Sequence, residues 1–414
     1  MNGIQERPQG ESGTLTAEGA SALILGGGFA GLEAAVGLSK QGLRVTLVSD
    51  RSEMFIYPTS IWMVTGEHRR EDDVINLDRA AAQYGFSFLL GNISAIDATH
   101  RSVVVNGETL SADFLILAMG AHRFQIPGMS HTHTVWGTPE DTEAVHQALE
   151  RLIERGGGRI ALGFGGNPKD GSAVRGGPLF EVLFNIDHLL RKRKIRDAFE
   201  LTFFAPMQKP GARMGSKAAD AVKSMLDKIG VRQIVGSKIE GFDENGVKLE
   251  GQRHLDADLT IFIPAGAGHA AIQGTNIPVN PAGFVTIDGQ CRVPGFPGVF
   301  AVGDIAAVEG PDWRAKQGHL TVAMAGVAVR TIANSLKQRI KHEDYREHVN
   351  IVCVMDTGNG AAFVKRTSKY ARLIFLPIIG HFLKKAWGQW YRFTHTRLLP
   401  RLFPRRSRSL PVSP

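Results

Sequence analysis

The chain has 414 residues, of which 43% are hydrophobic and 21% are charged. These proportions are those of an ordinary folded protein, and they exclude a disordered chain, a collagen-like repeat and a coiled coil. With only two cysteines, the chain has neither a disulfide scaffold nor a cysteine-rich metal site. The net charge of +8 comes from the C-terminal end, because twelve basic residues lie between positions 365 and 408 and no acidic residue follows Asp356.

Residues 1–20 are polar and contain no apolar segment, so we expect a flexible N-terminal tail without a secretory signal. The next segment predicts a strand (22–25), a glycine-rich turn (26–31), a helix (32–40), a second strand (44–48) and then an acidic residue, Asp50. This order is typical of a dinucleotide cradle. A glycine-rich turn without a ligand is the alternative interpretation.

Each part of the cradle has a physical role. Gly26 permits the tight turn, Gly28 lets a diphosphate approach the backbone, and Gly31 lets the helix pack closely against the strand. The helix N-terminus offers free N–H groups to the phosphates. Asp50 is placed to accept hydrogen bonds from ribose hydroxyls.

Later segments predict a second α/β unit. We expect strands at 114–118, 159–163, 201–205, 233–235, 246–249, 259–264 and 298–302, and helices at 178–194 and 316–336. Long or helical connections favour parallel sheets. The predicted fold class is therefore α/β, with two Rossmann-like FAD/NAD(P)-binding domains. We expect a tail at 1–20, a discontinuous FAD-binding domain at 21–140 and 265–340, a second Rossmann-like domain at 141–264 and a C-terminal module at 341–414.

The C-terminal module is basic and aromatic. Between residues 365 and 408, lysine and arginine alternate with Trp387, Trp390, Tyr391 and other apolar residues. Acid-free amphipathic segments of this kind lie in the headgroup region of bilayers. We therefore expect contact with an anionic membrane surface and a peripheral (monotopic) location. A packed helical hairpin or a homo-oligomer contact is the alternative. Nucleic acid is not expected, because no nucleic-acid-binding motif accompanies the basic residues.

Several motifs together resemble the FAD-binding signatures of flavoproteins with two dinucleotide-binding domains. They are the turn at 26–31, Asp50, the strand end Ala118-Met119-Gly120 and Val302-Gly303-Asp304. Within that group, the chain is similar to the sulfide:quinone oxidoreductases. The similarity lies in Ser49-Asp50-Arg51, the stretch 55–66 and Gly177-Pro178-Leu179-Phe180-Glu181. The resemblance covers about residues 21–395.

The resemblance implies non-covalent FAD, a small reduced donor, with sulfide as the leading candidate, and a membrane quinone as acceptor. It implies cofactor contacts at Gly26, Gly28, Phe29, Ala30, Gly31, Ser49, Asp50, Arg51, Pro58, Gly120, Gly303, Asp304, Lys316 and Gln317. It also implies three catalytic candidates: Lys316 at the flavin pyrimidine edge, Cys353 as a redox thiol and Glu181 as a proton relay. The alternatives are a solvated lysine, a small core residue and a helix-face carboxylate.

Two of the three cysteines usual in that family are missing. In the loops where they are expected, this chain has Trp136-Gly137 and Ser172-Ala173. Cys353 matches the third family cysteine, and Cys291 matches none. Disulfide chemistry needs two thiols within reach of one another. We therefore expect at most a single-thiol variant of sulfide oxidation.

Type II NADH dehydrogenases are the neighbouring branch and supply NAD(P)H as the alternative donor. A second nucleotide fingerprint should then follow the strand at 159–163, but in the stretch 163–168 the glycine spacing is incomplete. Lys169 and Arg175 could still bind phosphates. A third hypothesis is a flavin-binding membrane protein without turnover. No metal site is expected, because His131 and His133 have no supporting ligands.

Overall fold

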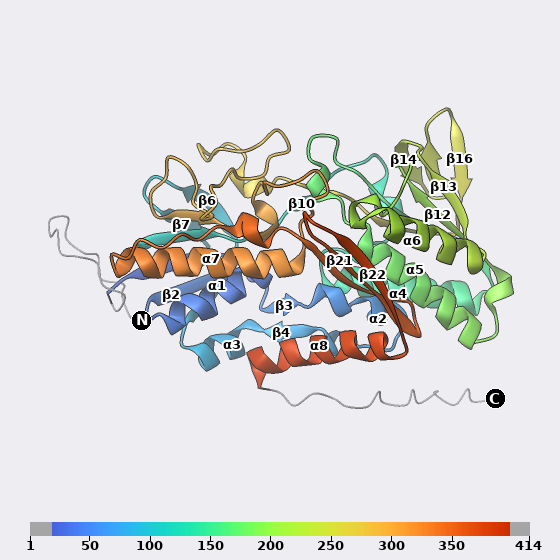
Figure 1. Cartoon of the computed structure of the whole chain (residues 1–414), viewed down its shortest axis with the longest axis horizontal. Helices are drawn as coiled ribbons and strands as arrows, with labels where there is room; N and C mark the ends of the chain where they lie inside the picture. Colours follow the sequence, from blue (N-terminus) through green and yellow to red (C-terminus); the bar gives the residue numbers. More distant parts are fainter. Residues whose placement is uncertain (1–18, 398–414) are drawn as a thin grey trace.

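Two parallel sheets organise residues 19–397, the part of the chain that the computed structural model describes (Figure 1). The first sheet has the strand order β19-β9-β1-β2-β5. Its strands are β1 (Ser21–Leu25), β2 (Arg44–Ser49), β5 (Ser87–Leu90), β9 (Phe114–Leu117) and β19 (Val299–Ala301). Helix α1 (Phe29–Lys40) packs against β2 and against α7 (Gly318–Leu336). The carboxyl ends of neighbouring parallel strands meet at one edge, where such sheets bind ligands.

The second sheet has the order β13-β12-β11-β17, and all its strands are parallel. They are β11 (Gly158–Phe164), β12 (Phe199–Ala205), β13 (Arg232–Val235) and β17 (Leu259–Ile263). Its helices are α4 (Pro139–Glu154), α5 (Gly177–Lys192) and α6 (Ser216–Lys228). Pro139 and Pro178 each lie in a first helical turn, where proline is tolerated because the N–H it lacks has no helical acceptor there.

Smaller elements flank the two sheets. One three-stranded antiparallel sheet contains β6 (Ile93–Asp97), β7 (Ser102–Val105) and β8 (Glu108–Ser111). A second one contains β14 (Ile239–Asp243), β15 (Gly246–Leu249) and β16 (Arg253–Asp256). Strand β3 (Glu53–Phe55) pairs with β4 (Val74–Asn76), near α2 (Ile61–Val64) and α3 (Leu77–Tyr84). Strands β10 (His122–Arg123) and β18 (Gly266–Ala267) pair where the chain crosses between the two sheets.

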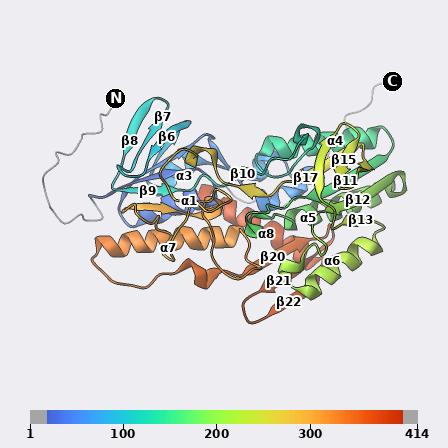
Figure 2. The same ribbon diagram turned by 90° about the horizontal axis from the view of Figure 1, so that it is seen from above.

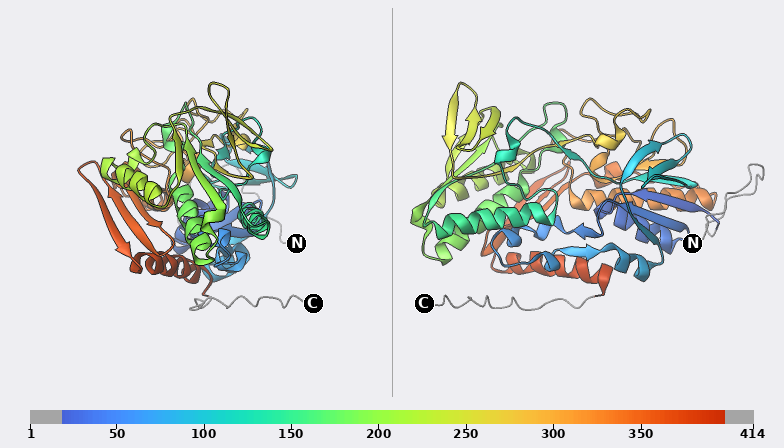
Figure 3. Two further views of the ribbon diagram at one scale, coloured as in Figure 1. Left: turned by 90° about the vertical axis from the view of Figure 1, so that its right-hand side faces the viewer. Right: turned by 180° about the vertical axis from the view of Figure 1, so that it is seen from behind.

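An antiparallel sheet and a long helix complete the described chain. Strands β20 (Ile351–Asp356), β21 (Gly360–Arg366) and β22 (Ala371–Pro377) pair in sequence order, and α8 (Ile379–Thr396) follows. Strand β22 lies beside α6 of the second unit (Figure 2). Helix α8 runs back along β4 and α3 and forms the outermost layer on one side of the molecule (Figures 1 and 3).

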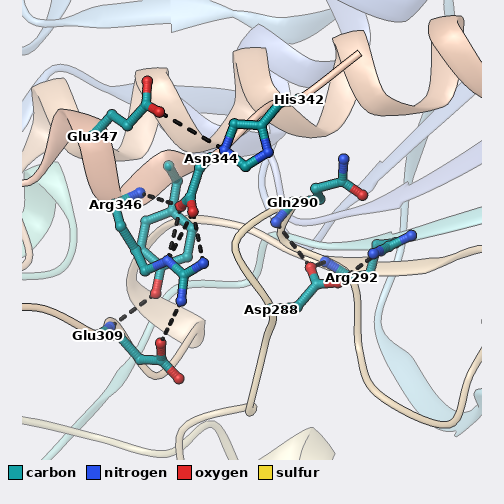
Figure 4. A network of polar contacts seen from close by, with 9 residues as sticks. Asp288, Gln290, Arg292, Glu309, His342, Asp344, Arg346 and Glu347 are labelled. Atoms are coloured by element: carbon teal, nitrogen blue, oxygen red, sulfur yellow. Dashed lines mark hydrogen bonds and ion pairs between the residues drawn. The ribbon is translucent and has the colours of Figure 1, made fainter. Parts of the chain in front are cut away.

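A polar cluster holds the connection between α7 and this C-terminal sheet (Figure 4). Arg346 donates from Nη2 to Asp344 at 2.6 Å and from Nη1 to Glu309 at 3.2 Å. The Tyr345 hydroxyl accepts from the Glu309 N–H at 2.8 Å, and the Tyr345 N–H donates to the Gly289 carbonyl at 2.9 Å. The start of the C-terminal sheet is therefore anchored to loops of the first unit.

The predicted α/β class with Rossmann-like parallel sheets is confirmed. The C-terminal module contains three strands before its helix, so its apolar stretch at 371–377 is a strand. The N-terminal tail expected at 1–20 lies almost entirely outside the described residues, as do Arg401, Arg405, Arg406 and Arg408 of the basic stretch. Within residues 19–397, no helix combines the length and apolar character that crossing a bilayer requires.

Candidate active site

A cleft of about 1530 Å³ runs from the glycine turn after β1, past the N-termini of α5 and α7, to β20 and α8. Most of the predicted cofactor residues line it, namely Gly26, Gly28, Phe29, Ala30, Ser49, Asp50, Arg51, Pro58, Gly120, Asp304, Lys316 and Gln317. The three predicted catalytic residues, Glu181, Lys316 and Cys353, line the same cleft.

The glycine turn has the geometry of a phosphate cradle. Gly26 has a φ of +107°, and a Cβ there would lie 2.5 Å from the Ala118 carbonyl oxygen. A Cβ at Gly31 would overlap the Gly26 carbonyl oxygen. At Gly28, by contrast, a Cβ would meet nothing within 4 Å, because this residue faces the open cleft. No side chain caps α1, so its first N–H groups are available to an anion.

Asp50 lies just past the end of β2, with 63% of its side chain exposed. The Nε of the next residue, Arg51, lies 3.7 Å from Oδ1 of Asp50, and Nη1 of Arg51 donates to the Gly137 carbonyl at 3.2 Å. The Asp50 carboxylate can therefore accept hydrogen bonds from a ligand in the cleft. Gly303 lies outside the cleft lining, and at its φ of +77° a Cβ would lie 3.0 Å from Cβ of Ala30. Its role is thus to keep the turn before Asp304 close to α1.

Asp304 lies beside two buried cations. It forms an ion pair with Arg175, and the Lys316 Nζ donates to its backbone carbonyl at 3.0 Å. Burial alone would raise the pKa of Asp304, but the charges of Arg175 and Lys316 hold that pKa below its ordinary value. Burial lowers the pKa of Lys316 to about 8, and this shift is opposed by Asp304. Lys316 is 6% exposed, so the alternative of a solvated lysine is wrong.

Glu181, on α5, is the centre of a buried polar network. Its Oε2 forms an ion pair with Lys384 of α8 and accepts the Asp356 N–H at 2.9 Å. The Asp356 carboxylate contacts His381 Nδ1 at 2.7 Å and accepts from Asn185 at 3.0 Å. Burial raises the pKa of Glu181 to about 7 even though Lys384 opposes the shift. Glu181 is therefore not a solvated helix-face carboxylate.

Cys353 lies on β20 with its side chain partly buried against the second unit. Burial raises its pKa to about 12, and the nearby Glu181 charge adds to this. At neutral pH, Cys353 is therefore a thiol, and a thiol is a poor nucleophile. Cys291 is fully buried in the core of the first unit, and burial raises its pKa as well. Neither cysteine forms a disulfide.

Two other groups at the cleft were not predicted from sequence. Tyr57 is close to Arg175, Glu181 and Asp304, and its buried hydroxyl has no hydrogen-bond partner among the described residues. Lys384 belongs to the basic stretch for which we expect membrane contact, yet its side chain points inward to Glu181. Tyr57 directly precedes Pro58, which is one of the predicted cofactor contacts, and this adjacency is a sequence signal for it. The inward direction of Lys384 had no local signal.

The loop after β11 does not form a second glycine cradle. The Asn167 side chain donates to the Gly266 carbonyl at 2.8 Å, and Asp170 accepts from Ser172 Oγ and from Asn280 at 2.6 and 3.0 Å. These bonds tie the loop to the connections between the two units. Arg175, considered above as a phosphate ligand, is paired with Asp304 instead.

The family model described as pyridine nucleotide-disulphide oxidoreductase matches residues 20–331. The chain belongs to this family. It is 26% identical over 326 residues to the type II NADH:quinone oxidoreductase Ndh of Mycobacterium tuberculosis, covering 70% of this chain and 67% of the relative. It is 24% identical to the demethylphylloquinone reductase NdbB of Synechocystis, covering 70% and 72%.

Solved structures share the fold of this oxidoreductase. The sulfide:quinone oxidoreductase of Aquifex aeolicus superposes with a TM-score of 0.82 at 20% identity, covering 91% of this chain and 92% of that one. NDH2 of Plasmodium falciparum gives 0.71 at 12% identity, covering 92% and 99%. The predicted resemblance to this group of flavoproteins is confirmed.

FAD is the cofactor of this oxidoreductase family, and the cleft fits it. Gly28 leaves space for a diphosphate, α1 offers uncapped N–H groups, and the carboxylates of Asp50 and Asp304 line the same cleft, where they can accept hydrogen bonds from hydroxyl groups of a dinucleotide. The Tyr57 hydroxyl and the Arg175 Nε are buried polar atoms without partners among residues 19–397, as expected of groups that meet a ligand. The prediction of FAD is thus confirmed.

Proposed function

We propose that this oxidoreductase acts at a membrane surface and passes two electrons from a small anionic donor, through FAD, to a membrane quinone. One observation carries the proposal. The cleft that holds the cofactor cradle continues to α8, where Leu383, Lys384 and Trp387 line it. FAD supplies the two-electron chemistry when bound. A hydrophobic acceptor could therefore reach the cofactor from the bilayer side.

Helix α8 supports the membrane contact because its polarity is inverted. Its buried face carries polar and charged residues, namely His381, Lys384, Arg392, His395 and Thr396. Its exposed face is apolar, with Ile379, Phe382, Leu383, Trp387 and Trp390 each at least 42% exposed. A water-facing helix would show the opposite pattern. Tryptophan and neighbouring cations favour the interface of a bilayer with an anionic surface.

At this end of the cleft, Glu181 is the group that can move a proton. Reduction of a quinone by two electrons consumes two protons, and a carboxyl with a pKa of about 7 is suited to donate one near neutral pH. Lys384 holds Glu181 in place, and Asp356 with His381 extends the network along the inner face of α8. The role of Lys316 is to provide positive charge near the N-terminus of α7.

The donor side of the cleft is basic. Lys209 and Arg213 line the cleft, as Cys353 does, and Arg213 donates to the Gly171 carbonyl at 2.5 Å. Positive lining favours an anionic donor. Hydrosulfide is small enough to need no nucleotide cradle in the second unit. This agrees with the loop after β11, which is held by hydrogen bonds and does not form a glycine cradle. Its oxidation leaves a sulfur atom, and Cys353 is the thiol that could accept it, because Cys291 is buried elsewhere.

NAD(P)H is the second candidate donor. The named relatives that use NADH favour it, and its phosphates would also suit a basic cleft. Anaerobic mixing of the FAD-loaded protein with sulfide, NADH or NADPH separates the candidates. Bleaching near 450 nm by sulfide alone supports the first, and bleaching by NADH or NADPH alone supports the second. If none of the three bleaches the flavin, the third hypothesis, a flavin-binding protein without turnover, replaces both.

A further inference from the structure

The two loops that lack the family's thiols meet at Trp136 and Arg175. Cζ of Arg175 lies 4.4 Å from the centre of the Trp136 ring. On its other side, Arg175 forms an ion pair with Asp304. The Arg175 side chain is only 11% exposed, and its Nε has no hydrogen-bond partner among the described residues. A guanidinium held between an aromatic face and a carboxylate has little freedom to move away.

We propose that Arg175, in one of the two loops where the resemblance leads us to expect a cysteine, is a fixed cation of the flavin site and raises the reduction potential of bound FAD. Two electrons and one proton convert oxidised FAD into its anionic reduced form, so the ring system gains one negative charge. A nearby cation in a site with little water stabilises that charge and has less effect on the neutral oxidised ring. The inference rests on FAD binding and not on the donor or the quinone.

Two other cations that line the cleft, Lys316 and Arg213, are less suited to this task. The Lys316 Nζ already donates to the carbonyls of Asp304 and Ala306, and burial lowers its pKa to about 8. Arg213 donates to the carbonyls of Gly171 and Arg314. Among the residues that the structure describes, the Arg175 Nε has no hydrogen-bond partner, and a guanidinium remains charged throughout the pH range in which proteins fold. Its positive charge therefore persists when the Lys316 charge is partly lost.

The test is the midpoint potential of the FAD-loaded protein, measured by anaerobic dithionite titration against reference dyes. Arg175→Gln should weaken the binding of reduced FAD relative to oxidised FAD by about tenfold, which lowers a two-electron potential by about 30 mV. In Arg175→Lys the midpoint potential should stay close to that of the wild-type protein, because lysine keeps the positive charge. Lys209→Gln is the matched control. It removes an exposed charge from the same cleft, so the binding ratio should change by less than about twofold.

An unchanged potential in Arg175→Gln overturns the proposal, and so does an equal fall in Arg175→Lys. Arg175→Met is a second neutral variant, whose stem still packs on Trp136. If both neutral variants lose oxidised FAD while Arg175→Lys retains it, the charge serves to bind the oxidised cofactor and not to favour its reduced form, and the proposal fails. If all three lose FAD, the side chain acts through packing and the proposal fails. No donor or quinone enters the measurement, so its failure is separate from failure of the proposed function.

Discussion

Lys384 of α8 and Glu181 of α5 form an ion pair across 203 positions of sequence, with side chains 7% and 6% exposed. The pair joins the outermost helix to the wall of the cleft. Removing one member of a buried pair leaves the other charge without compensation, which is far more costly than losing a surface pair. The attachment of α8 is therefore coupled to the ionisation of Glu181.

Lys384→Met tests this coupling through stability. Above pH 7, where Glu181 is charged, we expect the free energy of unfolding to fall by about 3 kcal/mol. At pH values where Glu181 is protonated the loss should be smaller. The control is Lys385→Met, since Lys385 pairs with Glu67 at side-chain exposures of 26% and 33% and should cost about 0–1 kcal/mol. Equal effects of the two substitutions in urea denaturation would contradict the coupling.

Glu181→Gln tests the raised pKa. Between the ordinary value of 4.5 and about 7, the folded protein keeps a proton that the unfolded chain loses. The contribution of Glu181 to the free energy of unfolding is therefore greatest below pH 4.5. It falls as the pH rises to 7, by up to about 3 kcal/mol. The glutamine variant should lack this fall when unfolding is measured across that window. It should also slow quinone reduction by about 10²-fold while donor-dependent bleaching is unchanged. A wild-type pH profile in the variant would refute the assignment.

Trp390→Ser and Phe382→Ser test the membrane face. Both side chains are more than 60% exposed, so folding should be unaffected. Each substitution should weaken binding to phosphatidylglycerol-containing vesicles by about thirtyfold, since burying a large apolar side chain contributes about 2 kcal/mol. Ile340→Ser, an exposed apolar residue in the loop after α7, is the control and should have no effect. Truncation after Thr367 is a poorer test because it also removes β22 and the buried contacts of α8. If both variants bind the vesicles as the wild-type protein does in a flotation assay, the exposed face of α8 is not the membrane-binding surface.

Gly28 and Gly31 should fail in different ways when replaced by alanine. A Cβ at Gly31 overlaps backbone, so Gly31→Ala should lower the melting temperature even without FAD. A Cβ at Gly28 meets only the open cleft, so Gly28→Ala should keep the stability of the apoprotein and lose FAD. Gly171→Ala is a control with space around its Cβ. Tight FAD binding by Gly28→Ala, read from absorbance near 450 nm, would contradict the position of the diphosphate.

Cys353→Ser separates the two donors. If the Cys353 thiol accepts sulfur, the serine variant should lose repeated turnover with sulfide and keep any bleaching by NADH. Because burial raises the pKa of Cys353 to about 12, we also expect slow alkylation by iodoacetamide near neutral pH compared with the unfolded protein. Rapid alkylation of the folded protein would show that the thiol is activated. Unchanged sulfide turnover in the variant would remove the role proposed for Cys353.

Sequence by itself determined the cofactor cradle. The strand, the glycines at 26, 28 and 31, the helix and Asp50 follow one another closely along the chain, so local backbone geometry is enough to bring them together at one turn. The parallel sheets were also predicted from sequence, because apolar strands alternate with helices along the chain. The antiparallel strands from β6 to β8 were not predicted, because short exposed hairpins have weak patterns.

Tertiary structure alone decided which residues share the cleft. Arg175 and Asp304 are 129 positions apart, and Lys384 was grouped with the surface cations until packing placed it against Glu181. The composition of α8 showed an amphipathic helix, but not that its polar face is buried and its apolar face exposed. Periodicity defines the two faces of a helix, whereas their direction depends on what the body of the protein offers. Here the body offers the buried carboxylates Glu181 and Asp356, which only cationic and hydrogen-bonding side chains can satisfy.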